Sequence, residues 1–120
     1  MHINNVSFGS ITIDQKIYTN DIYITADYKI EKRNKELSTK INGHRCLGKS
    51  KIEYLLKFSP KIIIIGTGLY GALPIDPDAK ELLDKNKIEI VVDKTPRVID
   101  KLNDLLKNNA KICAIIHITC

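Results

Sequence analysis

The second half of the chain alternates between two hydrophobic periods, and this alternation constrains the fold more than any other feature. Apolar runs at 62–65, 88–92 and 112–119 are typical of β-strands. Between them, apolar residues recur every three or four positions, which predicts helices. Strand–helix–strand steps need right-handed crossovers, so we expect these three strands to be parallel. The runs at 62–65 and 112–116 are apolar on both faces, as in interior strands of a covered sheet.

Signals at the helix ends support this interpretation. A first helix is predicted to begin with a capping box and to stop at Pro60, and two further helices to begin with an N-cap residue followed by proline. The three predicted starts are Ser50–Glu53, Asp76–Pro77 and Thr95–Pro96. Together with the strands, they give an αβαβαβ core over residues 49–120.

Residues 1–48 have the shorter period of a β-meander followed by a basic loop. Alternation at 6–13 surrounds Gly9, which we interpret as a bulge, and a β-branched and aromatic run follows at 22–26. Turns are predicted at 14–16 and 19–21. Residues 29–48 are polar and weakly patterned, so we expect a loop or a peripheral strand there.

The whole chain is predicted to form one domain over residues 1–120, with an α/β fold. Its 43% hydrophobic content is spread over short runs, and no run approaches the roughly 20 apolar residues that span a bilayer. We therefore expect no membrane insertion. The first residues lack the blocks of a signal peptide, and three cysteines (Cys46, Cys113, Cys120) at irregular spacing indicate free thiols. A cytoplasmic location is the resulting expectation.

The net charge of +5 is concentrated in one segment. Eight basic and two acidic residues lie between Lys29 and Lys51. Such a segment could follow a phosphate backbone, but Tyr28 at its edge is the only aromatic residue available for stacking. A solvated face, or a docking surface for an acidic protein, fits the segment better than nucleic-acid binding does.

Several motifs together resemble one known family. They comprise Phe8-Gly9-Ser10-Ile11, Tyr18 to Ile22, the turn at Ile65 to Gly68, Asn103, and the ending Ile115 to Cys120. The family is the small domain-of-unknown-function family that includes mitochondrial complex I assembly factor 3 and the adipogenesis-associated domain protein. Membership implies a three-layer β+α/β/α fold around a mixed five-stranded sheet with one antiparallel strand. It implies roles in assembly or interaction and no established enzymatic chemistry. The lysine-rich segment at 31–36 resembles the prokaryotic and archaeal branch.

Gly66, Gly68 and Gly71 have the spacing G-x-G-x-x-G of a dinucleotide-binding turn. A genuine site of this kind requires a helix that begins inside the motif, so that its amides face the pyrophosphate. Here two prolines and two aspartates push the helix start beyond the last glycine and place carboxylates where phosphate would sit (Pro74, Pro77, Asp76, Asp78). We therefore predict no nucleotide cofactor and interpret the motif as a strand-to-loop turn.

This turn is nevertheless the best candidate for a binding site, because ligand crevices in α/β folds form at the carboxyl ends of parallel strands. The candidate ligand-binding residues are Gly66, Thr67, Gly68, Tyr70, Gly71, His117 and His44.

Metal-binding and catalytic sites are not predicted. His117 shares a strand face with Cys113 and Ile115, whereas Cys120, three positions further on, would point the other way. His44 and Cys46 could share a face, but a structural zinc site needs four ligands. No catalytic triad is visible.

The sequence thus favours a non-catalytic interaction or assembly protein, whose partner is another protein, with a small crevice at Gly66–Gly71. Two alternatives remain open: a small-molecule or anion-binding protein or enzyme that uses this loop with His117, and a nucleic-acid-binding protein that uses Lys29–Lys51.

Overall fold

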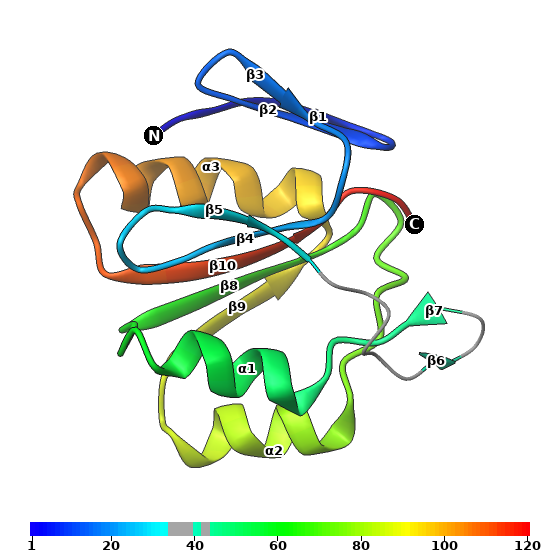
Figure 1. Ribbon diagram of the computed structural model, residues 1–120, viewed down its shortest axis with the longest axis vertical. Helices are drawn as coiled ribbons and strands as arrows, with labels where there is room; N and C mark the ends of the chain where they lie inside the picture. The colour runs from blue at the N-terminus through cyan, green and yellow to red at the C-terminus, as the bar shows by residue number, and fades with distance from the viewer. Residues whose placement is uncertain (34–39, 42–43) are drawn as a thin grey trace.

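A mixed five-stranded sheet forms the centre of the molecule (Figure 1). The computed structural model describes residues 1–33, 40–41 and 44–120, and at 40, 41, 44 and 45 only the backbone. Three neighbouring strands, β10, β8 and β9, are parallel, and only β4 runs against the others. The predicted mixed sheet with one antiparallel strand is thereby confirmed. In spatial order the strands are β5 (Ile30–Lys32), β4 (Ile22–Ile24), β10 (Ile112–His117), β8 (Ile62–Thr67) and β9 (Glu89–Asp93).

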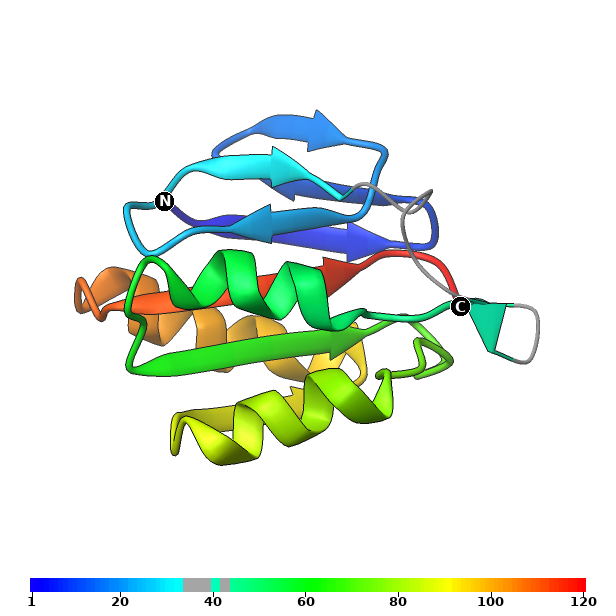
Figure 2. The ribbon, with the colours of Figure 1, turned by 60° about the horizontal axis from the view of Figure 1, so that its bottom comes forward.

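The two faces of the sheet are covered by different layers. Helices α1 (Lys49–Leu56) and α2 (Pro77–Lys85) cover one face, while α3 (Thr95–Lys107) lies behind the sheet in Figure 2. Residues 63, 65, 113 and 115 belong to the core under α1 and α2, and residues 64, 112, 114 and 116 to the core under α3. Strands β8 and β10 are therefore apolar on both faces, as predicted. Thr67 and His117 continue the alternation that faces α1 and α2.

The first residues form a separate three-stranded sheet that shares the α3 side of the molecule. Its strands are β1 (Ile3–Ser7), β2 (Ser10–Ile13) and β3 (Lys16–Tyr18), which confirms the predicted meander. Asn103 of α3 fixes it, because the amide side chain accepts from Ile3 N at 2.8 Å and donates to Ile3 O at 3.0 Å. Two short strands, β6 (Lys40–Ile41) and β7 (His44–Arg45), pair with each other.

Several local predictions differ from the structure. Gly9 is not a strand bulge: with φ of +85° it lies in the turn between β1 and β2, and the register irregularity lies instead between Ile3 and Asn5. The predicted capping box at the first helix is also wrong. That helix begins at Lys49 after Gly48, and no side chain caps it. The cause is that residues 46–48 already follow an extended path, since Leu47 forms a bridge to Ile75.

The two N-cap–proline predictions have different outcomes. Asp76 caps α2, because its carboxylate accepts from Asp78 N at 2.9 Å, and Pro77 is the first helical residue. Thr95 does not cap α3. It is itself the first residue of that helix, and its hydroxyl is engaged elsewhere.

Candidate functional site

The glycine motif lies at the carboxyl edge of the parallel strands, where β8 ends at Thr67. The residues that follow, 68–73, form what we call the glycine loop. Gly68 and Gly71 have φ of +103° and +73°, a region that residues with a Cβ rarely adopt. The chain reverses here and then crosses to α2.

The backbone amides of the glycine loop are all hydrogen-bonded inside the protein. Three of them hold residues 118–120, which we call the 118–120 segment: Leu69 N donates to Thr119 O at 2.8 Å, while Tyr70 N and Ala72 N donate to Cys120 O at 3.0 and 2.9 Å. The other three amides also have acceptors: Gly71 N donates to Gly68 O, Leu73 N to Thr67 O, and Gly68 N to Thr95 Oγ1. A phosphate-binding loop needs these amides free. The motif therefore acts here as a clasp on the 118–120 segment.

Close packing explains why glycine is needed at two of these positions. A Cβ on Gly68 would lie 2.4 Å from the Cys120 carbonyl carbon and 2.6 Å from His117 Cδ2. A Cβ on Gly66 would lie 2.7 Å from Thr95 Oγ1. The spacing of the glycines thus follows from contacts within the fold.

Thr95 connects the ends of β8 and β10 through one hydroxyl group. Its Oγ1 accepts from Gly68 N at 2.9 Å and donates to His117 O at 2.6 Å. Thr95 is fully buried, so both backbone groups would lack a partner without this hydroxyl. The Thr95 side chain, which the sequence predicts to cap a helix, forms this link between β8 and β10 instead.

A buried ionic cluster lies beside the clasp and was not predicted. Asp21 accepts from Arg33 Nη1 at 3.0 Å and from Ile118 N at 2.9 Å, and its Oδ2 lies 2.5 Å from His117 Nδ1. The side chains of Asp21 and Arg33 are fully buried. Arg33 also donates to Cys46 O at 3.0 Å. A charge pair in such a place stabilises the fold only because each partner compensates the other.

Both ring nitrogens of His117 have a polar neighbour. An ionised carboxylate only accepts, so Nδ1 carries the proton that is shared with Asp21. Nε2 lies 3.3 Å from the hydroxyl oxygen of Thr119.

The order Thr119, His117, Asp21 is that of a nucleophile, a base and the group that orients the base. Its surroundings do not complete a catalytic site. The neighbouring amides of the glycine loop, which would have to stabilise an oxyanion, already donate to carbonyls of the 118–120 segment. His117 is only 6% exposed. The arrangement fixes the end of β10 instead.

Two buried groups on the α1 and α2 side of the sheet, Tyr23 beside the cluster and Cys113 further along β10, are held in their neutral forms. Burial raises the pKa of Tyr23 to about 12, with the nearby Arg33 guanidinium acting in the opposite direction. Burial likewise raises the pKa of the Cys113 thiol to about 11. Cys113 is therefore no thiolate nucleophile at neutral pH.

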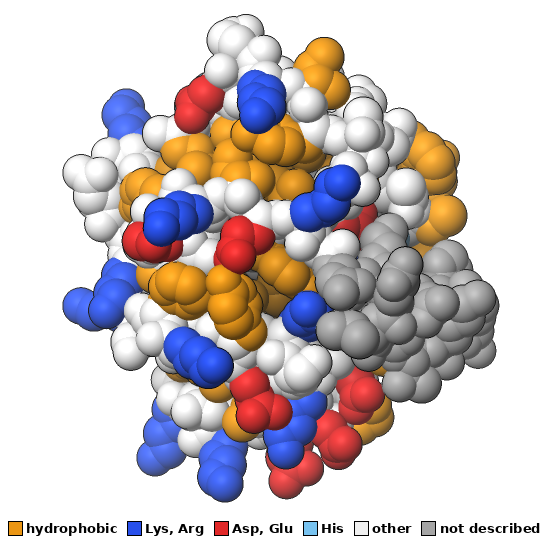
Figure 3. All heavy atoms as spheres, in the orientation of Figure 1, with side chains coloured by type: hydrophobic (Ala, Val, Ile, Leu, Met, Phe, Trp, Pro, Cys, Tyr) orange, Lys and Arg blue, Asp and Glu red, His pale blue; other side chains and the backbone are white. Residues whose placement is uncertain are grey.

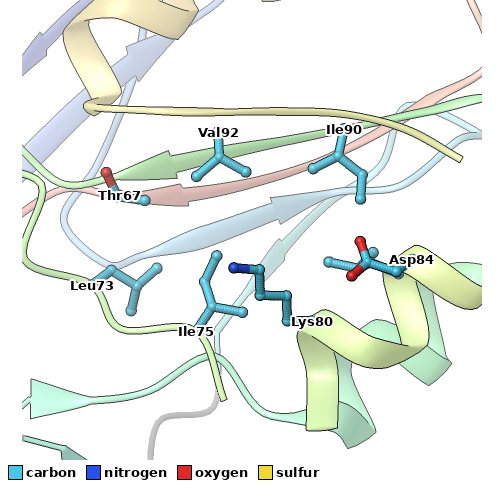
Figure 4. A pocket seen from close by; sticks show the side chains of 8 residues that line it. Thr67, Leu73, Ile75, Lys80, Asp84, Ile90 and Val92 are labelled. Atoms are coloured by element: carbon cyan, nitrogen blue, oxygen red, sulfur yellow. The ribbon is translucent and has the colours of Figure 1, made fainter. Parts of the chain in front are cut away.

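An open cavity of about 540 Å³ lies on the α2 side of the same edge, and we call it the α2 pocket (Figure 4). Its wall is mostly aliphatic. The strands contribute Thr67, Ile90 and Val92, the chain between β8 and α2 contributes Leu73 and Ile75, and α2 contributes Lys80, Leu83 and Asp84. In Figure 4 the Lys80 side chain extends from the helix into the space below the strands. The volume is in the usual range of ligand-binding pockets.

The family of the chain follows from comparison with known proteins. Residues 3–117 match the model of the family described as "Protein of unknown function (DUF498/DUF598)". The chain belongs to this family. The resemblance drawn from the sequence motifs is confirmed.

Several solved structures have the same fold as this chain. The conserved hypothetical protein PH1505 from Pyrococcus horikoshii OT3 is 34% identical, with a TM-score of 0.82 and 100% coverage of both chains. MT938 is 29% identical, with a TM-score of 0.81 and coverage of 99% of this chain and 98% of its own. An outer membrane protein from Bartonella henselae is 18% identical, with a TM-score of 0.71 and coverage of 98% and 94%. At this last identity the likeness supports the fold alone.

Within this DUF498/DUF598 fold, the candidate residues from the sequence lie in different environments. Gly66, Gly68 and Gly71 contribute backbone to the clasp and its close contacts. Thr67 is the register partner of His117, but its hydroxyl donates to Asp93 O at 3.1 Å and it lines the α2 pocket. His117 belongs to the ionic cluster.

Of the remaining two candidates, only Tyr70 has a described side chain. Tyr70 is 72% exposed, and its ring centroid lies 6.1 Å from that of Phe8 at the β1–β2 turn. The side chain of His44 lies outside the described part of the structure. A ligand-binding role of these candidate residues therefore stays a prediction.

Sequence reasoning missed the ionic cluster and the α2 pocket. Asp21 has the sequence of a turn residue and Arg33 lies in a polar run, so only the fold brings them to His117. The sequence carried only a weak signal of the pocket. Two of its lining residues, Lys80 and Asp84, lie four positions apart on the polar side of a predicted helix, and residues in such positions normally face water.

The basic segment is only partly described, and residues 34–39 and 42–43 lie outside the described part. Within the rest, Arg33 is engaged with Asp21 and is closed to solvent. On the face shown in Figure 3, Lys and Arg side chains are scattered with Asp and Glu between them. Nucleic-acid binding through this segment stays a prediction.

Two further facts concern metal binding and membrane crossing in the described part of this DUF498/DUF598 member. No three His, Cys, Asp or Glu side chains among them are placed to hold a metal ion together. None of the described helices combines the length and hydrophobicity that a bilayer crossing requires.

Proposed function

We propose that this protein is a non-catalytic interaction or assembly protein that binds another protein at the α2 pocket. The observation that carries the proposal is the pocket itself, which is an open, mostly aliphatic cavity of about 540 Å³ beside the glycine loop. It adjoins the place where the sequence predicts a crevice, at Gly66–Gly71, because its lining includes Thr67, which precedes the glycine loop, and Leu73, the last residue of the loop. Val92, which lines the pocket, is 46% exposed and gives the aliphatic wall a solvent-accessible side.

The chemistry of the neighbouring groups supports a binding role without catalysis. The loop amides are bonded to the 118–120 segment, and His117 is enclosed by Asp21 and Thr119. The cysteines of the chain are free, and Cys46 and Cys113 are buried. Free thiols suit a reducing compartment, so we extend the proposal to a cytoplasmic location.

The test is site-specific crosslinking in the native host. A photoreactive residue is placed at Val92 and, as the control, at Ile17, which is 66% exposed on β3 and does not line the α2 pocket. We expect one protein to crosslink at Val92 and not at Ile17. The purified partner should then lose at least about tenfold in affinity with Val92→Glu and no more than about twofold with Ile17→Glu.

Two results would overturn the proposal. One is equal crosslinking at both positions, because the partner would then not be selected by the pocket. The other is a purified partner whose affinity is unchanged in Val92→Glu while circular dichroism shows that the variant is folded. If a small molecule co-purifies with the protein and is lost in Val92→Glu, the pocket binds a small-molecule ligand and the proposal of a protein partner is wrong.

A further inference from the structure

Strand β9 forms one free edge of the central sheet. It pairs with β8 in parallel, and in the described part of the structure no strand lies on its other side. In a parallel pair, half of the backbone N–H and C=O groups of an edge strand point away from its neighbour. These groups are free to pair with another extended chain.

The sequence of β9 lacks the usual protection of an edge. Its five residues are Glu89-Ile90-Val91-Val92-Asp93, with the charges only at the two ends and no lysine or proline inside. Natural edges are normally short or carry such residues. The opposite edge, β5, has three residues and ends in Lys32. Of the two edges of the central sheet in the described part of the chain, β9 is thus the longer and the more apolar.

The α2 pocket opens along this edge. Ile90 and Val92 are two positions apart, so both side chains point to the α2 side and line the cavity. A strand added to β9 would lie about 4.8 Å away, and its alternate side chains would enter the same cavity about 6.6 Å apart. The groove between an edge strand and a helix is a known way of binding extended peptides.

Charges define the chemistry of such a peptide. Lys80 lines the cavity, and no acidic side chain among the described residues forms an ion pair with it, Asp84 one turn away included. Lys80 is exposed to solvent, and a carboxylate on the incoming chain would give it an ion-pair partner at the cavity. On the opposite face of β9, Asp93 is paired with Arg97 at 3.6 Å.

Self-association through this edge is disfavoured by the same charges. Antiparallel pairing of β9 with a second copy, in the register that pairs all five residues, places Glu89 opposite the second copy's Asp93, and this happens twice. Like charges directly opposite each other destabilise a strand pair. The edge is better matched to a different chain.

We infer that the partner binds as an extended peptide that adds a strand to β9, inserts two alternate apolar side chains into the α2 pocket and presents an acidic side chain to Lys80. This inference rests on the proposed function, since it specifies how the partner occupies the same pocket.

The test uses two capped synthetic peptides, Thr-Leu-Thr-Leu-Thr-Asp-Thr and its reverse, because the strand direction is set by the partner. We expect one of them to bind the full chain in fluorescence anisotropy at micromolar to millimolar concentration. In hydrogen-exchange NMR, amides of β9 should gain protection while those of β5 do not. N-methylation of the peptide at alternate amides should abolish binding in one register and leave it unchanged in the other.

Charge-swapped variants test the role of Lys80. Lys80→Glu should weaken binding of the acidic peptide at least tenfold, and a peptide with Lys in place of Asp should recover it. Lys85→Glu, on the last turn of α2 and outside the pocket, is the matched control and should change the affinity less than about twofold. If both variants weakened peptide binding equally, the effect would come from the overall charge of the protein. The pairing of the acidic side chain with Lys80 would then be overturned.

The outcomes separate this inference from the proposed function. Peptide binding without protection of the β9 amides overturns strand addition but leaves pocket binding intact. Failure of both peptides while a partner still crosslinks at Val92 also overturns the inference alone. Loss of the crosslinked partner overturns the proposed function itself. A dimer in analytical ultracentrifugation that Val92→Glu dissociates would show that a second copy occupies the edge.

Discussion

The clasp between the glycine loop and the 118–120 segment can be tested by one methyl group. Gly68→Ala adds a Cβ that would lie 2.4 Å from the Cys120 carbonyl carbon at a φ of +103°. Gly9→Ala is the matched control. Gly9 also has a positive φ, +85°, but a Cβ there would meet nothing within 4 Å.

The expected magnitudes follow from these contacts. A left-handed conformation costs a residue with a Cβ about 1–2 kcal/mol, which both variants share. Gly68→Ala must in addition displace the 118–120 segment, whose three hydrogen bonds from loop amides contribute about 1 kcal/mol each. We therefore expect a loss in the free energy of unfolding of about 3–5 kcal/mol for Gly68→Ala and about 1–2 kcal/mol for Gly9→Ala.

Urea denaturation followed by circular dichroism measures both losses, provided that the m-values of the variants agree. Hydrogen exchange at Leu69 and Tyr70 should accelerate in Gly68→Ala and stay slow in Gly9→Ala, because only the first variant opens the clasp. If the two variants lost the same free energy within about 0.5 kcal/mol, strain in φ alone would explain both. The steric role assigned to Gly68 would then be refuted.

Three further predictions concern other parts of the fold. Thr95→Val leaves Gly68 N and His117 O unpaired and should lower the free energy of unfolding by about 2–4 kcal/mol in urea denaturation. The control Thr67→Val should lower it by only about 1 kcal/mol, because the Thr67 hydroxyl has a single carbonyl partner. Asn103→Ala should cost about 2 kcal/mol and speed up exchange of the Ile3 amide, whereas Asn108→Ala, exposed at the end of α3, should stay within about 0.5 kcal/mol. The free energy of unfolding should fall as the pH rises from about 9 to about 12. In the folded protein the pKa of Cys113 is raised to about 11 and that of Tyr23 to about 12, so the unfolded chain releases these protons first. Tyr23→Phe should make this alkaline fall smaller, and an unchanged pH profile in that variant would contradict the assignment.

The sequence was sufficient for the parts of the fold that depend on local periodicity. Ile62–Thr67 and Ile112–His117 are buried strands because their residues are apolar on both faces, and Asp76 before Pro77 begins a helix through a cap of its own. These signals act within a few residues, so they survive without knowledge of the rest of the chain.

The parts that could not be predicted depend on contacts between distant residues. Thr95 has the sequence of a cap, but Gly68 and His117 take its hydroxyl. The importance of Asp21 arises from His117, 96 positions away. The α2 pocket depends on how α2 sits against an edge strand, which no periodicity encodes. The contacts around the candidate site were therefore hidden, while the position of the glycine turn at the carboxyl edge of the sheet was foreseeable.

The place of β10 in the sheet has a consequence for how the molecule folds. β10 follows all other elements in the sequence, yet it lies in the middle of the sheet, and it alone joins the β5–β4 pair to the β8–β9 pair. Until β10 inserts, the sheet is two separate ribbons with open edges on either side of the gap. Folding should therefore be limited by a long-range closing step and be slow for a chain of this size. A fragment that stops before β10 should aggregate through its unpaired strands, and a separate peptide that carries β10 should rescue it.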